Sequence, residues 1–126
     1  MAIGPDFLSF VRQHIRSVWT VELLLLLRSD RTRAWESPEL VRELRASRML
    51  VNDNLRRLEA AGLVIREDHH HRWRYRPAAP ALDELCGLLE KAYRERPVAL
   101  LDLIARPTDP IQSLADAFKF PGGGNE

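Results

Sequence analysis

The stretch from Ser47 to Pro77 constrains the fold more than any other part of the chain. It reads SRMLVNDNLRRLEAAGLVIREDHHHRWRYRP. Ser47 is a residue type that caps helix N-termini, and Gly62 stands where a left-handed residue is needed after a helix. Apolar residues between them recur at the i, i+4, i+7 spacing of a core face: Val51, Leu55 and Leu58. The sequence therefore predicts a helix over residues 47–61 that is stopped at both ends.

A β-hairpin is predicted directly after this helix, over residues 63–77. Residues 63–65 are apolar but too few for a helix, turn-compatible residues follow, and residues 71–76 alternate arginine with aromatics. Period-two geometry places Trp73 and Tyr75 on the side that faces the core. The opposite side, next to solvent or a phosphate backbone, receives the three arginines of the strand: Arg72, Arg74 and Arg76.

The side of the 47–61 helix that faces away from the core is polar. At 100° per residue, the positions opposite Val51 and Leu55 are Met49, Asn52, Asp53 and Arg56, with Arg48 and Arg57 on the flanks. Ser47 lies at the helix start. We expect these residues to form a contact surface for nucleic acid.

The segments before residue 47 predict three helices and a short strand. Residues 6–16 predict a helix capped by Asp6, with an apolar face that needs a cover in a free monomer. The helix that begins after Ser17 is apolar on nearly every side and should lie at the centre of the domain. Ala34-Trp35 fits a short strand. Ser37 is the expected N-cap of a helix from Pro38 to about Arg45, which with the 47–61 helix forms a helix-turn-helix candidate.

Residues 81–118 predict further helices, and residues 119–126 a mobile tail. Pro97 either kinks the first of these helices or starts a new one. Thr108 opens a last short helix.

Length and composition indicate a single domain. A chain of 126 residues with 45% apolar residues builds one core but no second full domain. One cysteine and no leader-like segment favour the cytoplasm, and no apolar run is long enough for a membrane span. Net charge is only +1, yet residues 1–41, 42–76 and 77–126 carry 0, +4 and −3. A basic middle beside an acidic tail is the distribution expected of a face that meets phosphate.

The segment over residues 17–77 resembles the MarR/ArsR-type winged-helix transcriptional regulators. The residues that carry the likeness are Leu55, Leu58, Glu59, Gly62, Leu63 and Val64, followed by the basic aromatic strand. The resemblance implies a mainly α fold with a small β-hairpin wing (α+β), a winged helix-turn-helix. It implies that Met49, Asn52, Asp53 and Arg56 meet base edges in the major groove and that Arg72 and Arg74 meet the DNA backbone. The family's dimerisation helices match residues 81–118 in position.

Two functions are compatible with these patterns. In the first, a homodimeric regulator reads double-stranded DNA, with Asn and Arg side chains supplying base contacts and wing arginines supplying salt-dependent affinity. The exposed apolar faces of residues 6–15 and 81–118 favour the dimer. In the second, the chain is a protein-interaction module that uses Trp73, Tyr75 and the acidic tail. Asp53 favours the second, because it repels phosphate unless it pairs with Arg56 or Arg57 or accepts from a cytosine amine.

The remaining reactive side chains predict no cofactor, metal or catalysis. His69, His70 and His71 form a wing tip that gains charge at mildly acidic pH, so we count His70 among the phosphate contacts. The chain lacks the cysteine and histidine spacings of a zinc site, and Cys86 lies on an apolar helix side, as a buried small hydrophobe does. No nucleophile elbow, phosphate loop or metalloprotease motif is present, so an enzyme is not expected.

Overall fold

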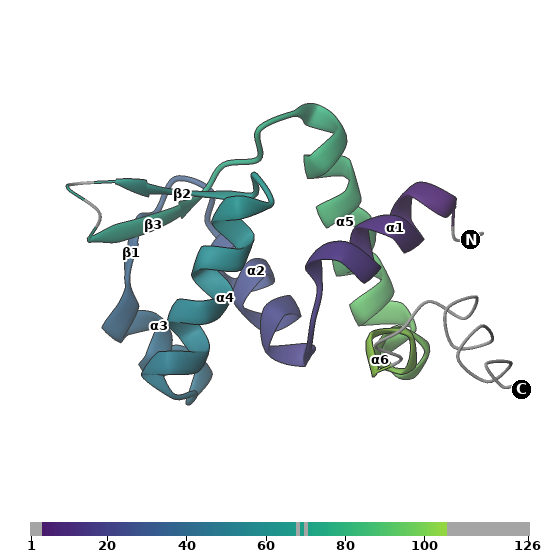
Figure 1. Cartoon of the computed structure of the whole chain (residues 1–126), viewed down its shortest axis with the longest axis horizontal. Coiled ribbons are helices and arrows are strands. Elements are labelled where there is room, and N and C mark those ends of the chain that lie inside the picture. Colours follow the sequence, from purple (N-terminus) through teal and green to yellow (C-terminus); the bar gives the residue numbers. More distant parts are fainter. Residues whose placement is uncertain (1–3, 68, 70, 106–126) are drawn as a thin grey trace, which may run out of the picture.

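The chain is mainly helical, with a small antiparallel sheet (Figure 1). The computed structural model describes residues 4–67, 69 and 71–105. The elements follow in the order α1 (Pro5–His14), α2 (Val18–Ser29), β1 (Trp35–Glu36), α3 (Ser37–Leu44), α4 (Arg48–Ala60), β2 (Val64–Glu67), β3 (Arg72–Tyr75), α5 (Pro80–Glu95) and α6 (Pro97–Ala105). The mainly α class with a β-hairpin is thus confirmed.

The three strands form one sheet in the order β1-β3-β2, and both neighbouring pairs are antiparallel. In the register, Trp73 lies opposite Trp35 on one side and Arg66 on the other, and Tyr75 lies opposite Val64. Trp73 and Tyr75 are 6% and 2% exposed, so the predicted alternation of β3 is confirmed.

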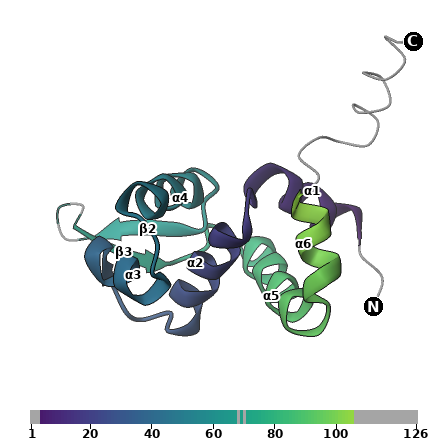
Figure 2. The same ribbon diagram turned by 90° about the horizontal axis from the view of Figure 1, so that it is seen from below.

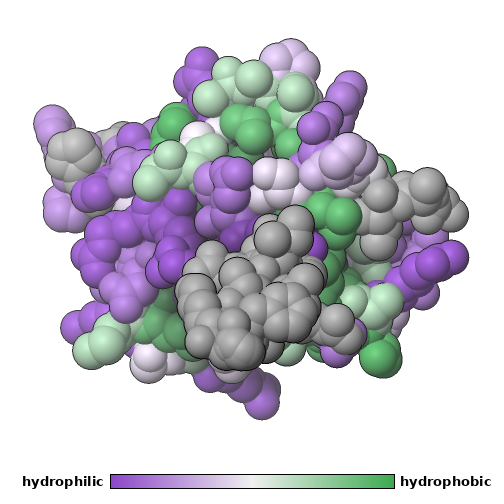
Figure 3. All heavy atoms as spheres, turned by 45° about the vertical axis from the view of Figure 1, so that its right-hand side comes forward, coloured by the Kyte–Doolittle hydropathy of each residue, from purple (hydrophilic) through white to green (hydrophobic). Residues whose placement is uncertain are grey.

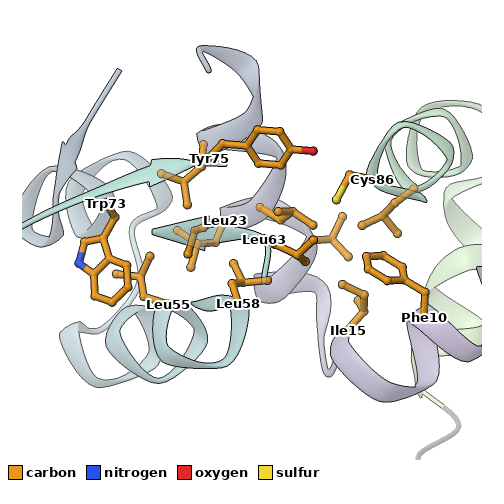
Figure 4. Packing of buried hydrophobic residues seen from close by; sticks show 14 of the residues in the cluster. Phe10, Ile15, Leu23, Leu55, Leu58, Leu63, Trp73, Tyr75 and Cys86 are labelled. Carbon is orange, nitrogen blue, oxygen red and sulfur yellow. The ribbon is translucent and has the colours of Figure 1, made fainter. Parts of the chain in front are cut away.

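The elements gather at two ends of the molecule, and α2 lies between them (Figure 2). The sheet, α3 and α4 occupy one end, whereas α1, α5 and α6 occupy the other. The buried residues form one continuous cluster, which in Figure 4 runs from Trp73 and Leu55 at the sheet end to Phe10 and Cys86 at the other. The central position predicted for the second helix is confirmed on one side, where Val21, Leu23, Leu24 and Leu27 are at most 1% exposed. Its burial is not all-round, because Leu25 and Leu26 on the other side are only half-buried.

Both predicted ends of α4 are confirmed. The Ser47 hydroxyl accepts a hydrogen bond from the Leu50 amide at 3.0 Å. At the other end, Gly62 has φ +80° and donates to the Glu59 carbonyl, while the Leu63 amide donates to the Leu58 carbonyl, each at 3.0 Å. This pair of bonds is a Schellman motif, which satisfies carbonyls that the helix end would leave without donors.

The start of α3 differs from the prediction. The N-cap is Glu36 rather than Ser37, and the helix begins one residue earlier than Pro38. The Glu36 amide donates to the Glu39 carboxylate at 2.9 Å, and the Glu36 side chain accepts from the third helical amide, so a capping box closes this end. Because Glu36 and Glu39 cap the helix, the Ser37 hydroxyl is free to bond elsewhere. The strand before it is likewise shifted by one residue, to Trp35–Glu36.

Helix α1 is covered by the same chain. It runs over Pro5–His14 rather than 6–16, with Gly4 rather than Asp6 at its N-cap, because Pro5 suits the first helical position. Its apolar side chains Phe7, Phe10 and Val11 are at most 5% exposed and pack in the common core next to α5. The apolar face that the sequence left without a cover is therefore buried within one chain.

At the C-terminal end, Pro97 starts a new helix, α6, which was one of the two alternatives for it. The helix expected from Thr108 and the tail expected over residues 119–126 lie outside the described residues. Within the described ranges, no helix combines the length and apolar character that crossing a bilayer needs.

Candidate nucleic-acid interface

The outer side of α4 is exposed and carries most of the predicted contact residues. Arg48, Met49, Asp53 and Arg56 are exposed, with Met49 at 74%. The Arg56 guanidinium lies 2.7 Å from the Asp53 carboxylate, so the pairing that the sequence required of Asp53 is present. The positive charge of Arg56 thereby offsets the negative charge of the Asp53 carboxylate on this surface, so this arginine adds no net positive charge.

Asn52 shares this side of α4 and is held from α3. The Ser37 hydroxyl, at the start of α3, donates to Asn52 Oδ1 at 2.8 Å. Asn52 is half-buried, unlike its exposed neighbour Asp53. The first residue of α3 therefore fixes one side chain of the candidate surface.

Arg57 does not join this surface. It is half-buried and lines a groove of about 620 Å³. The other lining residues include Arg12 of α1, Arg16 just after α1, and Leu103 and Ile104 of α6. This side of α4 faces the end of the molecule that holds α1, α5 and α6. The structure thus separates Arg57 from the Asn52 and Arg56 side chains with which the sequence had grouped it.

The β2–β3 hairpin brings the three predicted arginines to the outer side of the sheet. Arg72 and Arg76 are exposed, as expected. Arg74 is less exposed than these two, because it is half-buried and forms an ion pair with Glu67 on β2. Its Nη2 lies 2.5 Å from the Glu67 carboxylate. The sheet register also places Arg72 opposite Glu67, so this surface is less basic than the arginine count alone suggests.

The tip of the hairpin contains the histidines. His69 is exposed and has φ +58°, a left-handed turn conformation. His71 is exposed as well. His70, which we expected from the sequence to contact phosphate, lies outside the described residues.

Arg66 belongs to the neighbourhood of this surface and was not predicted. It bonds the Glu59 carboxylate of α4 at 3.0–3.2 Å, and its guanidinium lies 4.9 Å from the centre of the Trp73 ring. It ties the hairpin to the recognition-helix candidate α4. Alternation along β2 predicts that Arg66 lies on the same side of the strand as Val64. It does not predict the bond to Glu59, which depends on how the sheet packs against α4.

A buried polar pair holds α4 against α2, and it was also missed. The Thr20 hydroxyl donates to Asn54 Oδ1 at 2.6 Å, and Asn54 Nδ2 donates to the Leu50 carbonyl at 2.9 Å. Thr20 is 0% and Asn54 7% exposed. The signal was present, because Asn54 lies three residues after Val51 and four before Leu58, on the core side of the helix.

A second polar cluster joins the hairpin to α5. The Tyr75 hydroxyl donates to Asp83 Oδ1 at 2.7 Å, and Arg31 lies 2.9 Å from the same carboxylate. The Tyr75 hydrogen bond, with help from Arg31, lowers the pKa of Asp83, and burial raises that of Tyr75. Cys86 is fully buried nearby, and burial raises the pKa of its thiol. Its burial was predicted; the cytoplasmic location that a lone cysteine favours stays a prediction.

Comparisons with known proteins assign no family: no family model, curated protein or solved structure matches the chain. Among the described residues, no group of three His, Cys, Asp or Glu side chains is placed to hold a metal ion. The case for a function therefore depends on the geometry of α4 and the hairpin.

Proposed function

We propose that the chain is a winged helix-turn-helix protein that binds double-stranded DNA. In this proposal α3 and α4 are the helix-turn-helix, α4 is the recognition helix and the β2–β3 hairpin is the wing. The order of helices and strands supports it, as does the short turn at residues 45–47, where Arg45 takes a left-handed conformation with φ +54°. The third strand, β1, pairs with β3 and completes the small sheet beside the helices.

The observation that carries the proposal is the polar outer side of α4. It presents an exposed guanidinium from Arg48 and one from Arg56, with the Asn52 amide between them. A helix of 13 residues is about 20 Å long, enough to lie in the major groove, where such groups bond base edges. The exposed arginines of the wing, Arg72 and Arg76, suit phosphate contacts on either side of the groove.

Fluorescence anisotropy with a labelled random-sequence duplex tests this function. We expect binding that weakens steeply with salt, because arginine contacts release counterions from the phosphates. The double variant Arg72→Ala/Arg76→Ala should reduce the slope of log affinity against log salt by about 2, since each phosphate contact contributes about 0.9. Arg94→Ala, an exposed arginine of α5 at the other end of the molecule, is the matched control and should leave the slope unchanged. Absence of wild-type binding at about 50 mM salt would refute the proposal.

A protein-interaction module is the second candidate, and the ion pairs favour it. Ion pairs among the described residues of α4 and the hairpin join Arg56 to Asp53, Arg66 to Glu59, and Arg74 to Glu67. Such mixed charge, with an exposed Met49 beside it, also suits a protein surface. Trp73 and Tyr75, which the sequence offered as contacts of such a module, are instead buried in the core at 6% and 2% exposure. The same anisotropy series separates the two candidates, because this one predicts no salt-dependent binding to duplex DNA.

We propose a homodimer as the assembly that reads a palindromic site. Support comes from apolar side chains left exposed on the C-terminal helices, Leu88 at 36% and Val98 at 80%. Figure 3 shows hydrophobic residues on this side of the molecule in separate patches among hydrophilic ones. The burial of α1 within the chain removes one of the two grounds that the sequence gave. Light scattering should return twice the 14.5 kDa mass of one chain, and a monomer at micromolar concentration would contradict the dimer.

A further inference from the structure

The side-chain amide of Asn52 is hydrogen-bonded to a hydroxyl on the neighbouring helix. Its Oδ1 accepts the Ser37 hydroxyl hydrogen at 2.8 Å, so the oxygen end of the amide points towards α3. Among the described residues, the buried polar side-chain atoms without a partner are Arg28 Nε and Trp35 Nε1 only. Asn52 Nδ2 is not one of these atoms and has no acceptor among the described residues, so it reaches the surface.

The start of α3, which carries Ser37, is fixed independently of Asn52. The Glu36–Glu39 capping box closes the helix end, and Arg33 bonds the Glu39 carboxylate at 3.2 Å while its guanidinium lies 3.5 Å from the centre of the Trp35 ring. Backbone hydrogen bonding from Glu36 and the charge of Arg33 lower the pKa of Glu39, which keeps the cap ionised. Ser37 therefore has a set position, and its hydroxyl is not needed as a cap.

We infer that Ser37 is a positioning residue that makes Asn52 a hydrogen-bond donor at one base pair of the DNA site. The inference rests on the proposed function, in which α4 lies in the major groove. With the oxygen end held by Ser37, the amide presents its two N–H groups outward. In the major groove these groups find acceptors at N7 of either purine, at O6 of guanine and at O4 of thymine.

This orientation changes the base preference expected of an asparagine. An unrestrained asparagine recognises adenine by accepting from N6 and donating to N7, and this needs both ends of the amide. Asn52 offers one end only, which removes the reason to prefer adenine. The N7 and O6 acceptors of guanine lie side by side, so the amide nitrogen can donate to either of them, and we expect guanine at this position.

The test compares discrimination at single base pairs with general DNA affinity. A preferred duplex is first selected from a random pool with the wild-type chain, and each position is then varied in competition anisotropy. Ser37→Ala should lose at least about fivefold discrimination at one position, the lower end of what one specific contact contributes. Affinity for random duplex, the salt slope and the thermal midpoint should stay unchanged, because phosphate contacts and the α3 cap are intact.

Three further variants make the result specific. Asn52→Ala should lose discrimination at the same position, and Ser37→Thr, which keeps a hydroxyl, should retain it. Ser29→Ala removes a hydroxyl that bonds only the Leu26 carbonyl within its own helix and should change nothing. Replacing guanine at that position by 7-deazaguanine should weaken binding of the wild type but not of Asn52→Ala.

The outcomes separate this inference from the function beneath it. If the wild type binds DNA specifically but Ser37→Ala keeps full discrimination, the inference is wrong and the function stands. A wild-type preference for cytosine or for the adenine amino group at the Asn52 position would show that Oδ1 faces outward, which also overturns it. If the wild type binds no duplex, both fail together.

Discussion

The buried hydrogen bond between Thr20 and Asn54 should contribute measurably to the stability of the fold. It joins the central helix α2 to α4, and both side chains are at most 7% exposed. Thr20→Val replaces the hydroxyl by a methyl group of similar size, so it removes the donor without opening a cavity. Asn54 Oδ1 then stays buried without a donor, while Asn54 Nδ2 keeps its bond to the Leu50 carbonyl.

We expect Thr20→Val to lower the free energy of unfolding by about 1–3 kcal/mol, the cost of leaving a buried acceptor without a hydrogen bond. Replacing both partners, as Thr20→Val/Asn54→Leu, should cost less than the sum of the two single changes. The reason is that no buried polar atom of the pair then remains unsatisfied.

Urea unfolding followed by circular dichroism and tryptophan fluorescence measures the free energy of unfolding of the wild type, the two single variants and the double variant. Thr32→Val is the matched control, because the Thr32 hydroxyl bonds Asp30 in an exposed turn, and it should change stability by less than about 0.5 kcal/mol. A loss of unfolding free energy for Thr20→Val no larger than that of this control would contradict a stabilising role for the bond. So would strict additivity of the two single changes in the double variant.

Three further predictions test other parts of the structure. Gly62→Ala should destabilise the fold by about 1–2 kcal/mol in chemical unfolding, because φ is +80° and an added Cβ would lie 3.3 Å from Ala78 Cβ. Asp83→Asn should be less stable than wild type at neutral pH, and the two should converge below about pH 3.8. The pKa of Asp83 is lowered in the folded chain, so its contribution is present above that pH and lost as the carboxylate protonates; parallel curves would contradict this. Arg57→Ala should leave the salt slope of DNA binding unchanged, since Arg57 faces the α1–α6 groove; a slope reduced by about 1 would place it on the DNA.

The parts of the fold that depend on local chemistry were predictable from the sequence. Ser47 and Gly62 act on the helix between them, so both ends of α4 were set by neighbouring residues. The alternation of Trp73 and Tyr75 along β3 likewise needs no knowledge of distant partners. At the start of α3 the predicted N-cap, Ser37, was wrong. The cap is the neighbouring Glu36, which forms a capping box with Glu39.

The parts that depend on tertiary contacts were not predictable. Helix α1 is covered by α5, which begins more than 60 residues later in the chain, so its apolar face suggested an external partner. The hairpin arginines were predicted on the correct side of β3, but the Glu67 pairing of Arg74 follows from the register of two strands. The Ser37 bond to Asn52 depends on how α3 crosses α4, which no pattern along the chain reports.

The most direct test of the central claim is photocrosslinking from the outer side of α4. A benzophenone-bearing amino acid would replace either Met49 on α4 or Val98 on α6, since both are exposed apolar residues, at 74% and 80%. Irradiation with a labelled duplex at low salt should give a protein–DNA crosslink from position 49 and none from position 98. Crosslinking from position 98 alone, or from neither position under conditions where the duplex is bound, would contradict the assignment of α4 as the recognition helix.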